Sequence, residues 1–339
     1  MKQPIRIGIL GLGRIGKMHA KNIASMKEFE IVCGSDPFLT AETEAEMREI
    51  GIPKCTKDPE DIFSDASIDA IVICSVTETH SDFIIRAAQA GKDIFCEKPI
   101  DHNVARILTA LRAVKEANVI LQVGFMHRFD KHHGALQSKI ADGTIGKLEV
   151  LKITSRDPAP PSMDYIRTSG GIYVDFMIHD FDMARFLTGS EVTEVFATGT
   201  SVCDPEISAC GDVGSGHAIL RFENGAIGIL ETSRRSSFGH DQRIEALGSK
   251  GCVMNDNVYE NNVRFFTTNG FHGAKVPYHF PERYKDAYFV ELRDFAEAVR
   301  NRTAPPVTGF DGLQAVLIAE AAARSAASGK MEVVEQIEV

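Results

Sequence analysis

Residues 5–16, IRIGILGLGRIG, decide the fold of the first part of the chain. The apolar run at 5–10 predicts a buried strand, and residues 17–26 predict a helix. The GxGxxG pattern lies between them. Its first glycine permits a tight turn, its second lets the backbone approach a pyrophosphate, and its third lets helix and strand pack closely. This order predicts a dinucleotide site at the helix N-terminus; a glycine turn without a ligand is the alternative.

Asp36 indicates which dinucleotide is bound. A second apolar strand, residues 29–34, precedes this acid, which stands 20 positions after Gly16. A carboxylate there can accept hydrogen bonds from a ribose diol and would repel a 2′-phosphate. The neighbouring sequence Ser35-Asp36-Pro37 offers no arginine for such a phosphate. NAD is therefore predicted in preference to NADP.

Strands and helices alternate through residues 1–125. Further strands are expected at 68–74, 92–96 and 119–125, and helices at 40–50, 81–90 and 103–117. This alternation predicts a parallel sheet with right-handed crossovers, that is, an α/β Rossmann domain. Ligands of such sheets bind at the carboxyl ends of the strands.

Two strand ends carry polar residues suited to a cofactor. Ser75, Thr77 and His80 follow one strand, and Glu97-Lys98-Pro99 follows the next. Lys98 could hydrogen-bond both a nicotinamide ribose and a substrate hydroxyl, and its charge would stabilise a developing alkoxide. For Thr77 and His80, helix capping and turn formation are equally good explanations. The predicted cofactor-binding residues are Gly11, Gly13, Arg14, Ile15, Gly16, Asp36, Ser75, Thr77, His80, Glu97 and Lys98.

A second chemical signal is the segment 170–182, GGIYVDFMIHDFD. It is expected to turn helical after its two glycines, which would place Asp175 and His179 on one face, one turn apart. A carboxylate beside an imidazole is a proton-transfer pair, because the acid fixes the ring and raises its basicity. Asp182 follows on roughly the same side. The alternative is an amphipathic helix with a satisfied histidine and solvated aspartates.

Residues 126–339 are expected to form a second, α+β domain. After a helix at 131–141 and a strand at 146–155, strands joined by short turns predict a large, mostly antiparallel sheet with one open face. Tyr284 and Tyr288 belong to the first of two closing helices and are expected chiefly to pack. The later strands are predicted at 192–203, 216–222, 226–233, 242–247, 252–255 and 263–266, and the closing helices at 282–300 and 311–328.

Charge and cysteine usage limit the possible functions. A net charge of −10 argues against nucleic acid or an anionic membrane as the main partner. The seven cysteines form no CxxC pair, so reduced thiols in a cytoplasmic protein are expected. No signal peptide, membrane span or metal-ligand cluster is evident from the sequence.

Together, GLGRIG, Ser35-Asp36, CEKP at 96–99 and GGxxxDxxxHDxD at 170–182 resemble the glucose-fructose oxidoreductase/inositol dehydrogenase/rhizopine catabolism (Gfo/Idh/MocA) family over nearly the whole chain. The resemblance implies that Lys98, Asp175 and His179 form the catalytic group. The substrate would contact these three catalytic residues and, in addition, Arg128, Asp157 and Asp182. It further implies a homotetramer built through the open sheet.

Three stretches, residues 122–130, 155–158 and 170–182, are similar to inositol 2-dehydrogenases. They imply NAD-dependent oxidation of a cyclic polyol, myo-inositol, to 2-keto-myo-inositol. Two positions depart from the expected pattern: His127 precedes Arg128 in place of a second arginine, and His240 lies in a segment where tyrosines are common. A dehydrogenase of scyllo-inositol or of a pyranose such as glucose or xylose is the alternative enzyme, and a non-catalytic NAD sensor is the alternative of another class.

Overall fold

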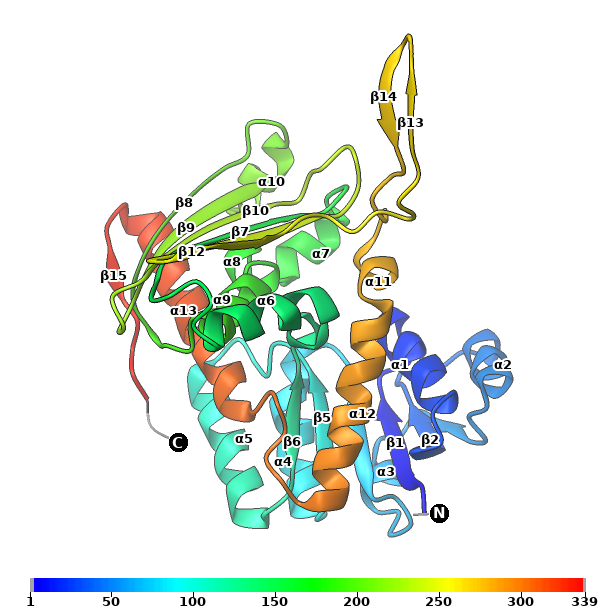
Figure 1. Ribbon diagram of the computed structural model, residues 1–339. Helices are drawn as coiled ribbons and strands as arrows, with labels where there is room; N and C mark the ends of the chain where they lie inside the picture. Colours follow the sequence, from blue (N-terminus) through cyan, green and yellow to red (C-terminus); the bar gives the residue numbers. More distant parts are fainter. Residues whose placement is uncertain (1–2, 338–339) are drawn as a thin grey trace. The chain divides into compact units, whose positions relative to one another are not determined.

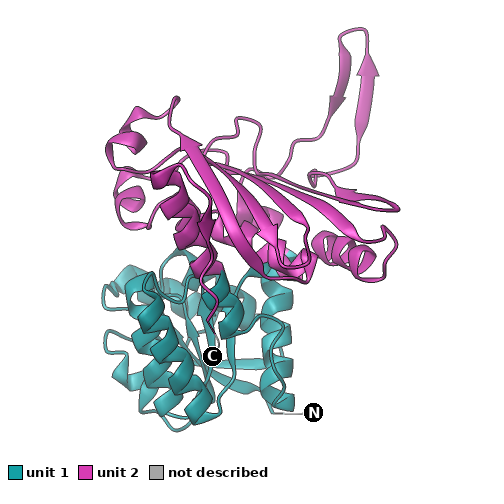
Figure 2. Ribbon diagram, turned by 90° about the vertical axis from the view of Figure 1, so that its left-hand side faces the viewer, with its two compact units in different colours: residues 1–126, 286–314, 339 teal, residues 127–285, 315–338 magenta. Residues whose placement is uncertain are grey.

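A computed structural model describes residues 3–337, which divide into two compact units (Figure 2). Of the described residues, unit 1 comprises 3–126 and 286–314, and unit 2 comprises 127–285 and 315–337. The first division lies between Met126 and His127, and the predicted boundary lay between 125 and 126. The second domain was expected to run unbroken from 126 to 339, whereas the chain returns to unit 1 for most of helix α12 (Lys285–Asn301).

Unit 1 is built on a six-stranded parallel sheet in the order β3-β2-β1-β4-β5-β6 (Figure 1). Its central strand β4 is apolar and buried throughout, as expected for a parallel sheet with helices on both faces. The predicted Rossmann architecture is confirmed. The strands are β1 (Ile5–Leu10), β2 (Phe29–Ser35), β3 (Cys55–Thr56), β4 (Ala70–Ile73), β5 (Asp93–Glu97) and β6 (Leu121–Gly124).

The helices of unit 1 follow the strands in alternation. Thr40 and Asn103 cap α2 and α5 with their side chains, each accepting a hydrogen bond from the backbone N–H three residues on. Helix α1 begins at Arg14, three residues before the predicted start, because Gly16 belongs to its first turn and not to the loop. The helices are α1 (Arg14–Ala24), α2 (Ala41–Ile50), α3 (Glu60–Phe63), α4 (His80–Gln89), α5 (Val104–Ala117) and α12.

Unit 2 is built on a seven-stranded sheet in the order β12-β11-β7-β10-β9-β8-β15. Only the β7–β10 pair is parallel, so the prediction of a mostly antiparallel sheet is confirmed. The strands are β7 (Leu148–Arg156), β8 (Val192–Thr200), β9 (Ser215–Phe222), β10 (Ile227–Ser233), β11 (Asp241–Gly248), β12 (Gly251–Asn255) and β15 (Glu332–Val333).

The strand predicted at 263–266 lies outside this sheet. It is β13 (Arg264–Thr267), which pairs only with β14 (Gly270–Gly273) in a separate hairpin (Figure 1). Helices α6 (Lys131–Ala141), α8 (Ile172–Asp175) and α9 (Ile178–Thr188) lie on one side of the large sheet. The remaining helices are α7 (Met163–Thr168), α10 (Pro205–Ala209), α11 (Phe280–Arg283) and α13 (Gly309–Ser328).

The other face of the large sheet is open and partly apolar. Ile219 on β9 pairs with Ile229 on β10. Ile227 on β10 and Leu247 on β11 both pair with the same residue of β7, the strand between them. Each of these four side chains is 41–43% exposed. Among residues 3–337, no helix combines the length and the apolar character that a membrane crossing requires.

Candidate active site

The glycine loop after β1 shows a different constraint at each glycine. Gly11 has φ +91°, and a Cβ there would lie 2.5 Å from the Cys74 carbonyl oxygen. A Cβ on Gly16 would lie 1.9 Å from the Gly11 carbonyl oxygen. A Cβ on Gly13, in contrast, would meet no protein atom within 4 Å. The first and third glycines are therefore required by packing, and the second leaves the backbone open to a ligand.

This loop fits a dinucleotide. Gly13 is the N-cap of α1, whose first N–H groups have no helical partner and can face phosphate oxygens. Asp36 Oδ2 accepts a hydrogen bond from the Leu12 N–H at 2.8 Å, and Oδ1 accepts one from the Phe38 N–H at 2.8 Å. Because a carboxylate can accept about four hydrogen bonds, Asp36 keeps acceptor capacity for a ribose diol.

His80 ties two strand ends together. Its Nδ1 lies 2.8 Å from the Pro99 carbonyl oxygen and its Nε2 lies 3.0 Å from that of Ser75. The ring is buried, and burial lowers its pKa. Nearby, the Ser75 and Thr79 hydroxyls are 2.7 Å apart. These contacts favour turn formation, the alternative weighed for His80 in the sequence, while its role toward a cofactor stays a prediction.

The turn Glu97-Lys98-Pro99 follows β5, and its Lys98–Pro99 peptide bond is cis. Glu97 points inward: its Oε1 lies 2.7 Å from His19 Nε2, and its side chain is 14% exposed. The predicted cofactor residue Glu97 thus has a protein partner on α1 that the sequence spacing did not reveal.

The segment 170–182 forms two helices and not the single helix that was predicted. Asp175 is the last residue of α8 and His179 is the second residue of α9. Between them the Met177 N–H donates to the Ile172 carbonyl at 2.8 Å, an i+5 turn that interrupts the regular ladder. Helical spacing carries no signal for such a turn, because neither glycine nor proline occurs at the break.

Asp175 is held by two residues from other elements. The Tyr165 hydroxyl donates to its Oδ1 at 2.7 Å, and Arg234 Nη1 lies 3.1 Å from its Oδ2. Arg234 is buried and also contacts Asp212 at 3.3 Å. Neither Tyr165 nor Arg234 was predicted, since Arg234 is 59 residues from Asp175 along the chain.

Asp180 and Asp182, on α9, are fully buried with different partners. Asp182 pairs with the predicted Arg128 through two hydrogen bonds of 2.8 and 2.6 Å. Asp180 accepts from Ser155 and Thr232 hydroxyls at 2.5 and 2.8 Å. Burial raises the pKa of Asp180 to about 7, and the hydroxyls oppose the rise.

Two histidines that depart from the family pattern lie in unit 2 with His179. The His127 ring is 4.8 Å from the His179 ring and 4.4 Å from the Tyr284 ring, centroid to centroid. Burial, and then the charge of His179, hold the pKa of His127 well below its usual value. His240 Nδ1 lies 3.0 Å from Oδ1 of Asp157, one of the residues expected to contact the substrate.

Tyr284 is completely buried within unit 2, as expected of a packing residue, while Tyr288 belongs to unit 1. The predicted residues Arg128, Asp157, Asp175, His179 and Asp182 all belong to unit 2. Lys98 and the other residues predicted to bind the cofactor belong to unit 1.

A parallel sheet with this glycine loop, joined to a unit carrying an acid and a histidine, defines an NAD-binding oxidoreductase. The description of the family that matches residues 5–125 agrees: an oxidoreductase family with an NAD-binding Rossmann fold. Residues 133–254 match the GFO/IDH/MocA C-terminal domain. The chain therefore belongs to the Gfo/Idh/MocA family, and the resemblance and the NAD prediction are confirmed.

Known proteins resemble the chain along nearly its full length. A myo-inositol 2-dehydrogenase of Thermotoga maritima is 46% identical over 95% of this chain and 96% of its own. A scyllo-inositol 2-dehydrogenase (NAD(+)) of Bacillus subtilis is 39% identical over 97% of this chain and 96% of its own. The crystal structure of a myo-inositol dehydrogenase from Corynebacterium glutamicum superposes with a TM-score of 0.93 at 37% identity, covering 98% and 100% of the two chains.

Proposed function

We propose that this chain oxidises myo-inositol with NAD and releases 2-keto-myo-inositol. One observation carries the proposal. The chain combines a glycine loop that fits NAD with an Asp175 carboxylate that Tyr165 and Arg234 hold in place. His179 follows Asp175 by four residues. The extent of the likeness to the myo-inositol 2-dehydrogenase of Thermotoga maritima supports the choice of substrate.

The proposed catalytic group is Lys98, Asp175 and His179. His179 accepts the proton of the hydroxyl that is oxidised, and Asp175 orients the ring and balances the imidazolium that results. The Lys98 ammonium group stabilises the negative charge that develops on the same oxygen. NAD, when bound, supplies the chemistry of hydride acceptance.

Arg128, Asp157 and Asp182 are proposed to select the ring. Inositol isomers differ only in the direction of a hydroxyl group, so selection requires donors and acceptors held in fixed positions. The pairs Arg128–Asp182 and Asp157–His240 restrict these side chains to fixed positions. A buried polar group left unpaired by the wrong isomer costs about 1–3 kcal/mol, or roughly tenfold to a hundredfold in rate for each contact.

The relative of Bacillus subtilis supports scyllo-inositol as the second candidate substrate. A panel of myo-inositol, scyllo-inositol, glucose and xylose, each with NAD and with NADP, would separate the candidates by the absorbance of the reduced nicotinamide. We expect saturable reduction of NAD with myo-inositol at the highest kcat/KM. Reduction with a pyranose alone would contradict the proposal, and tight NAD binding without reduction by any member would indicate a sensor.

We also propose a homotetramer assembled through the open sheet face, and a cytoplasmic location. Ile219, Ile227, Ile229 and Leu247 supply an apolar patch for the interface. All seven cysteines are unpaired, which suits a reducing compartment. Sedimentation velocity should give four chains per particle for the wild type and fewer for Ile229→Asp; a wild-type monomer would contradict the assembly.

A further inference from the structure

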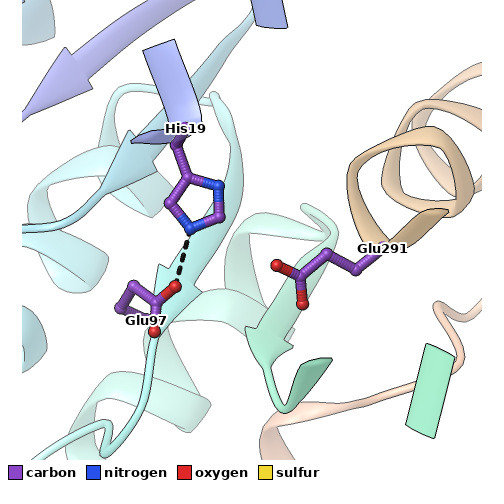
Figure 3. Close-up of side chains that lie close together, drawn as sticks. All are labelled: His19, Glu97 and Glu291. Atoms are coloured by element: carbon purple, nitrogen blue, oxygen red, sulfur yellow. Dashed lines mark hydrogen bonds and ion pairs between the residues drawn. The ribbon is translucent and has the colours of Figure 1, made fainter. Parts of the chain in front are cut away.

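A buried cluster of three titratable side chains lies directly behind the Lys98 turn. His19 comes from α1, Glu97 from the end of β5, and Glu291 from α12, all within unit 1 (Figure 3). His19 and Glu97 are hydrogen-bonded at 2.7 Å, and one potential ligand atom from each of the three residues lies within 4.8 Å of the other two. The proposed chemistry assigns no role to Glu291.

The surroundings leave the Glu97 carboxylate little freedom. A Cβ on Gly124, its neighbour on β6, would lie 3.2 Å from the carboxylate, so the glycine makes room for this group. The His19 ring is fully buried edge-on to Phe95 and Tyr288, with centroids 5.2 and 5.7 Å away. Glu97 is therefore fixed by α1 and β6 on two sides.

Glu291 has no such partner among the described residues. It is fully buried, and neither of its carboxyl oxygens has a hydrogen-bond partner in the part of the chain that the structure describes. Figure 3 shows its carboxyl group directed toward the His19–Glu97 pair. Burial, and then the charge of Glu97, raise its pKa well above the usual value.

The other titratable groups around Glu291 do not reverse this effect. Cys74 directly follows β4. Burial, and then the charges of Glu97, Cys96 and Glu291, raise the pKa of its thiol. His19 is engaged with Glu97, and Tyr288 lies on the same helix as Glu291. An ionised Glu291 would add a second buried negative charge beside Glu97, whereas a neutral carboxylic acid supplies an O–H donor.

We propose that Glu291 is a positioning residue: as a neutral acid it hydrogen-bonds the Glu97 carboxylate through one bridging water, and so fixes the turn that carries Lys98. The Glu97 carboxylate then receives hydrogen bonds from α1 and from α12. Because α1 begins at the glycine loop, the cluster links the cofactor loop to the lysine turn. This role rests on the proposed function for its catalytic consequence.

A histidine with two glutamates can also bind a divalent metal ion. The neutral-acid role and the metal site predict opposite results for Glu291→Gln. Glu291→Gln keeps a hydrogen-bond donor but cannot supply a carboxylate to a metal. Glu291→Met keeps the volume and removes the donor. Glu297→Gln, on the exposed side of the same helix, is the matched control.

The kinetic test compares these variants with myo-inositol and NAD. We expect Glu291→Gln and Glu297→Gln to retain wild-type kcat. Glu291→Met should lose about tenfold to a hundredfold in kcat, the effect of one hydrogen bond to a charged group, with the KM for NAD unchanged. Its thermal midpoint should be lower than that of Glu291→Gln, because the buried Glu97 carboxylate loses one hydrogen bond. Equal kcat in the Gln and Met variants would overturn the proposal.

Two measurements do not require polyol oxidation. Infrared spectra should show a protonated carboxylic acid at neutral pH that Glu291→Gln removes, and amide hydrogen exchange at 98–101 should be faster in Glu291→Met than in Glu291→Gln. If both hold in a protein inactive toward polyols, the proposed function fails and the positioning role stands. One equivalent of bound metal in the wild type, lost in Glu291→Gln, would overturn the neutral acid.

Discussion

The glycine loop of unit 1 and the segment 170–182 of unit 2 both begin with glycine and lead into a helix, yet their proposed roles depend on opposite features. In the loop, the absence of side chains matters: Gly11 and Gly16 touch backbone, and Gly13 leaves the backbone open. In the segment, the side chains matter, because Asp175 and Asp182 bind arginines from distant parts of unit 2.

This difference has a physical origin. A loop that binds through its backbone needs only local geometry, and local geometry follows from neighbouring residues. A site built from side chains needs partners brought in by the fold, and Arg128 is 54 residues from Asp182 along the chain. Adding a methyl group should therefore disturb the loop, and removing or neutralising a side chain should disturb the segment.

The largest effect is expected for His179→Ala. Loss of the proposed general base should lower kcat about 10²–10⁴-fold, because proton transfer by a positioned group contributes that much. The KM for NAD should not change, since the glycine loop is intact. His272→Ala, at an exposed position on β14 and outside the large sheet, is the control. Unchanged turnover in His179→Ala would show that the side chains of the segment do not perform the chemistry.

Asp180→Asn should alter the pH dependence of stability. The pKa of Asp180 is raised by burial from 3.8 to about 7, so the folded protein retains this proton at a pH where the unfolded chain has lost it. The free energy of unfolding should therefore fall as pH rises between these two values and level off above the higher one. A pKa shift of about three units changes the free energy of unfolding by about 4 kcal/mol at most.

Urea denaturation of both proteins from acidic to mildly alkaline pH measures this contribution. The difference between wild type and Asp180→Asn should change with pH inside that window and be constant above it. A difference that is flat throughout the window would mean that Asp180 is not kept neutral by its burial.

Gly13→Ala should produce the smallest effect and act on the cofactor alone. The added methyl group meets no protein atom within 4 Å, so the thermal midpoint without cofactor should stay the same. It would crowd an approaching pyrophosphate, which should cost about 1–3 kcal/mol, or about tenfold to a hundredfold in NAD affinity by calorimetry. Gly134→Ala, also in open space but on α6, is the control. Equal NAD affinity in both variants would place the cofactor elsewhere.

Much of the fold was predictable from local pattern. Residues 131–141 form α6 as predicted, and the alternation in unit 1 yields its parallel sheet. Strand β3 and helix α3 were missed because two and four residues are too few to show a period. The strand predicted at 263–266 was assigned to the large sheet, and β14, its actual partner, was not predicted, because a strand pattern does not specify its neighbour.

The site was predictable as a set of residue types but not as a set of contacts. The spacing of Asp175 and His179 predicted one helix, and the i+5 turn at Met177 divides it. Glu291 stands in an ordinary amphipathic pattern, and only the packing of α12 in unit 1 buries it beside Glu97. Tyr165 and Arg234 carried no sequence signal, because their roles depend on how unit 2 folds.

The central claim is that hydride passes from one ring carbon of the polyol to NAD. It is tested most directly with myo-inositol deuterated at carbon 2 and mass spectrometry of the reduced cofactor. The reduced cofactor should gain the deuterium, and the product ketone should lack it. Unlabelled reduced cofactor, together with a product ketone that keeps the deuterium, would contradict hydride transfer from carbon 2.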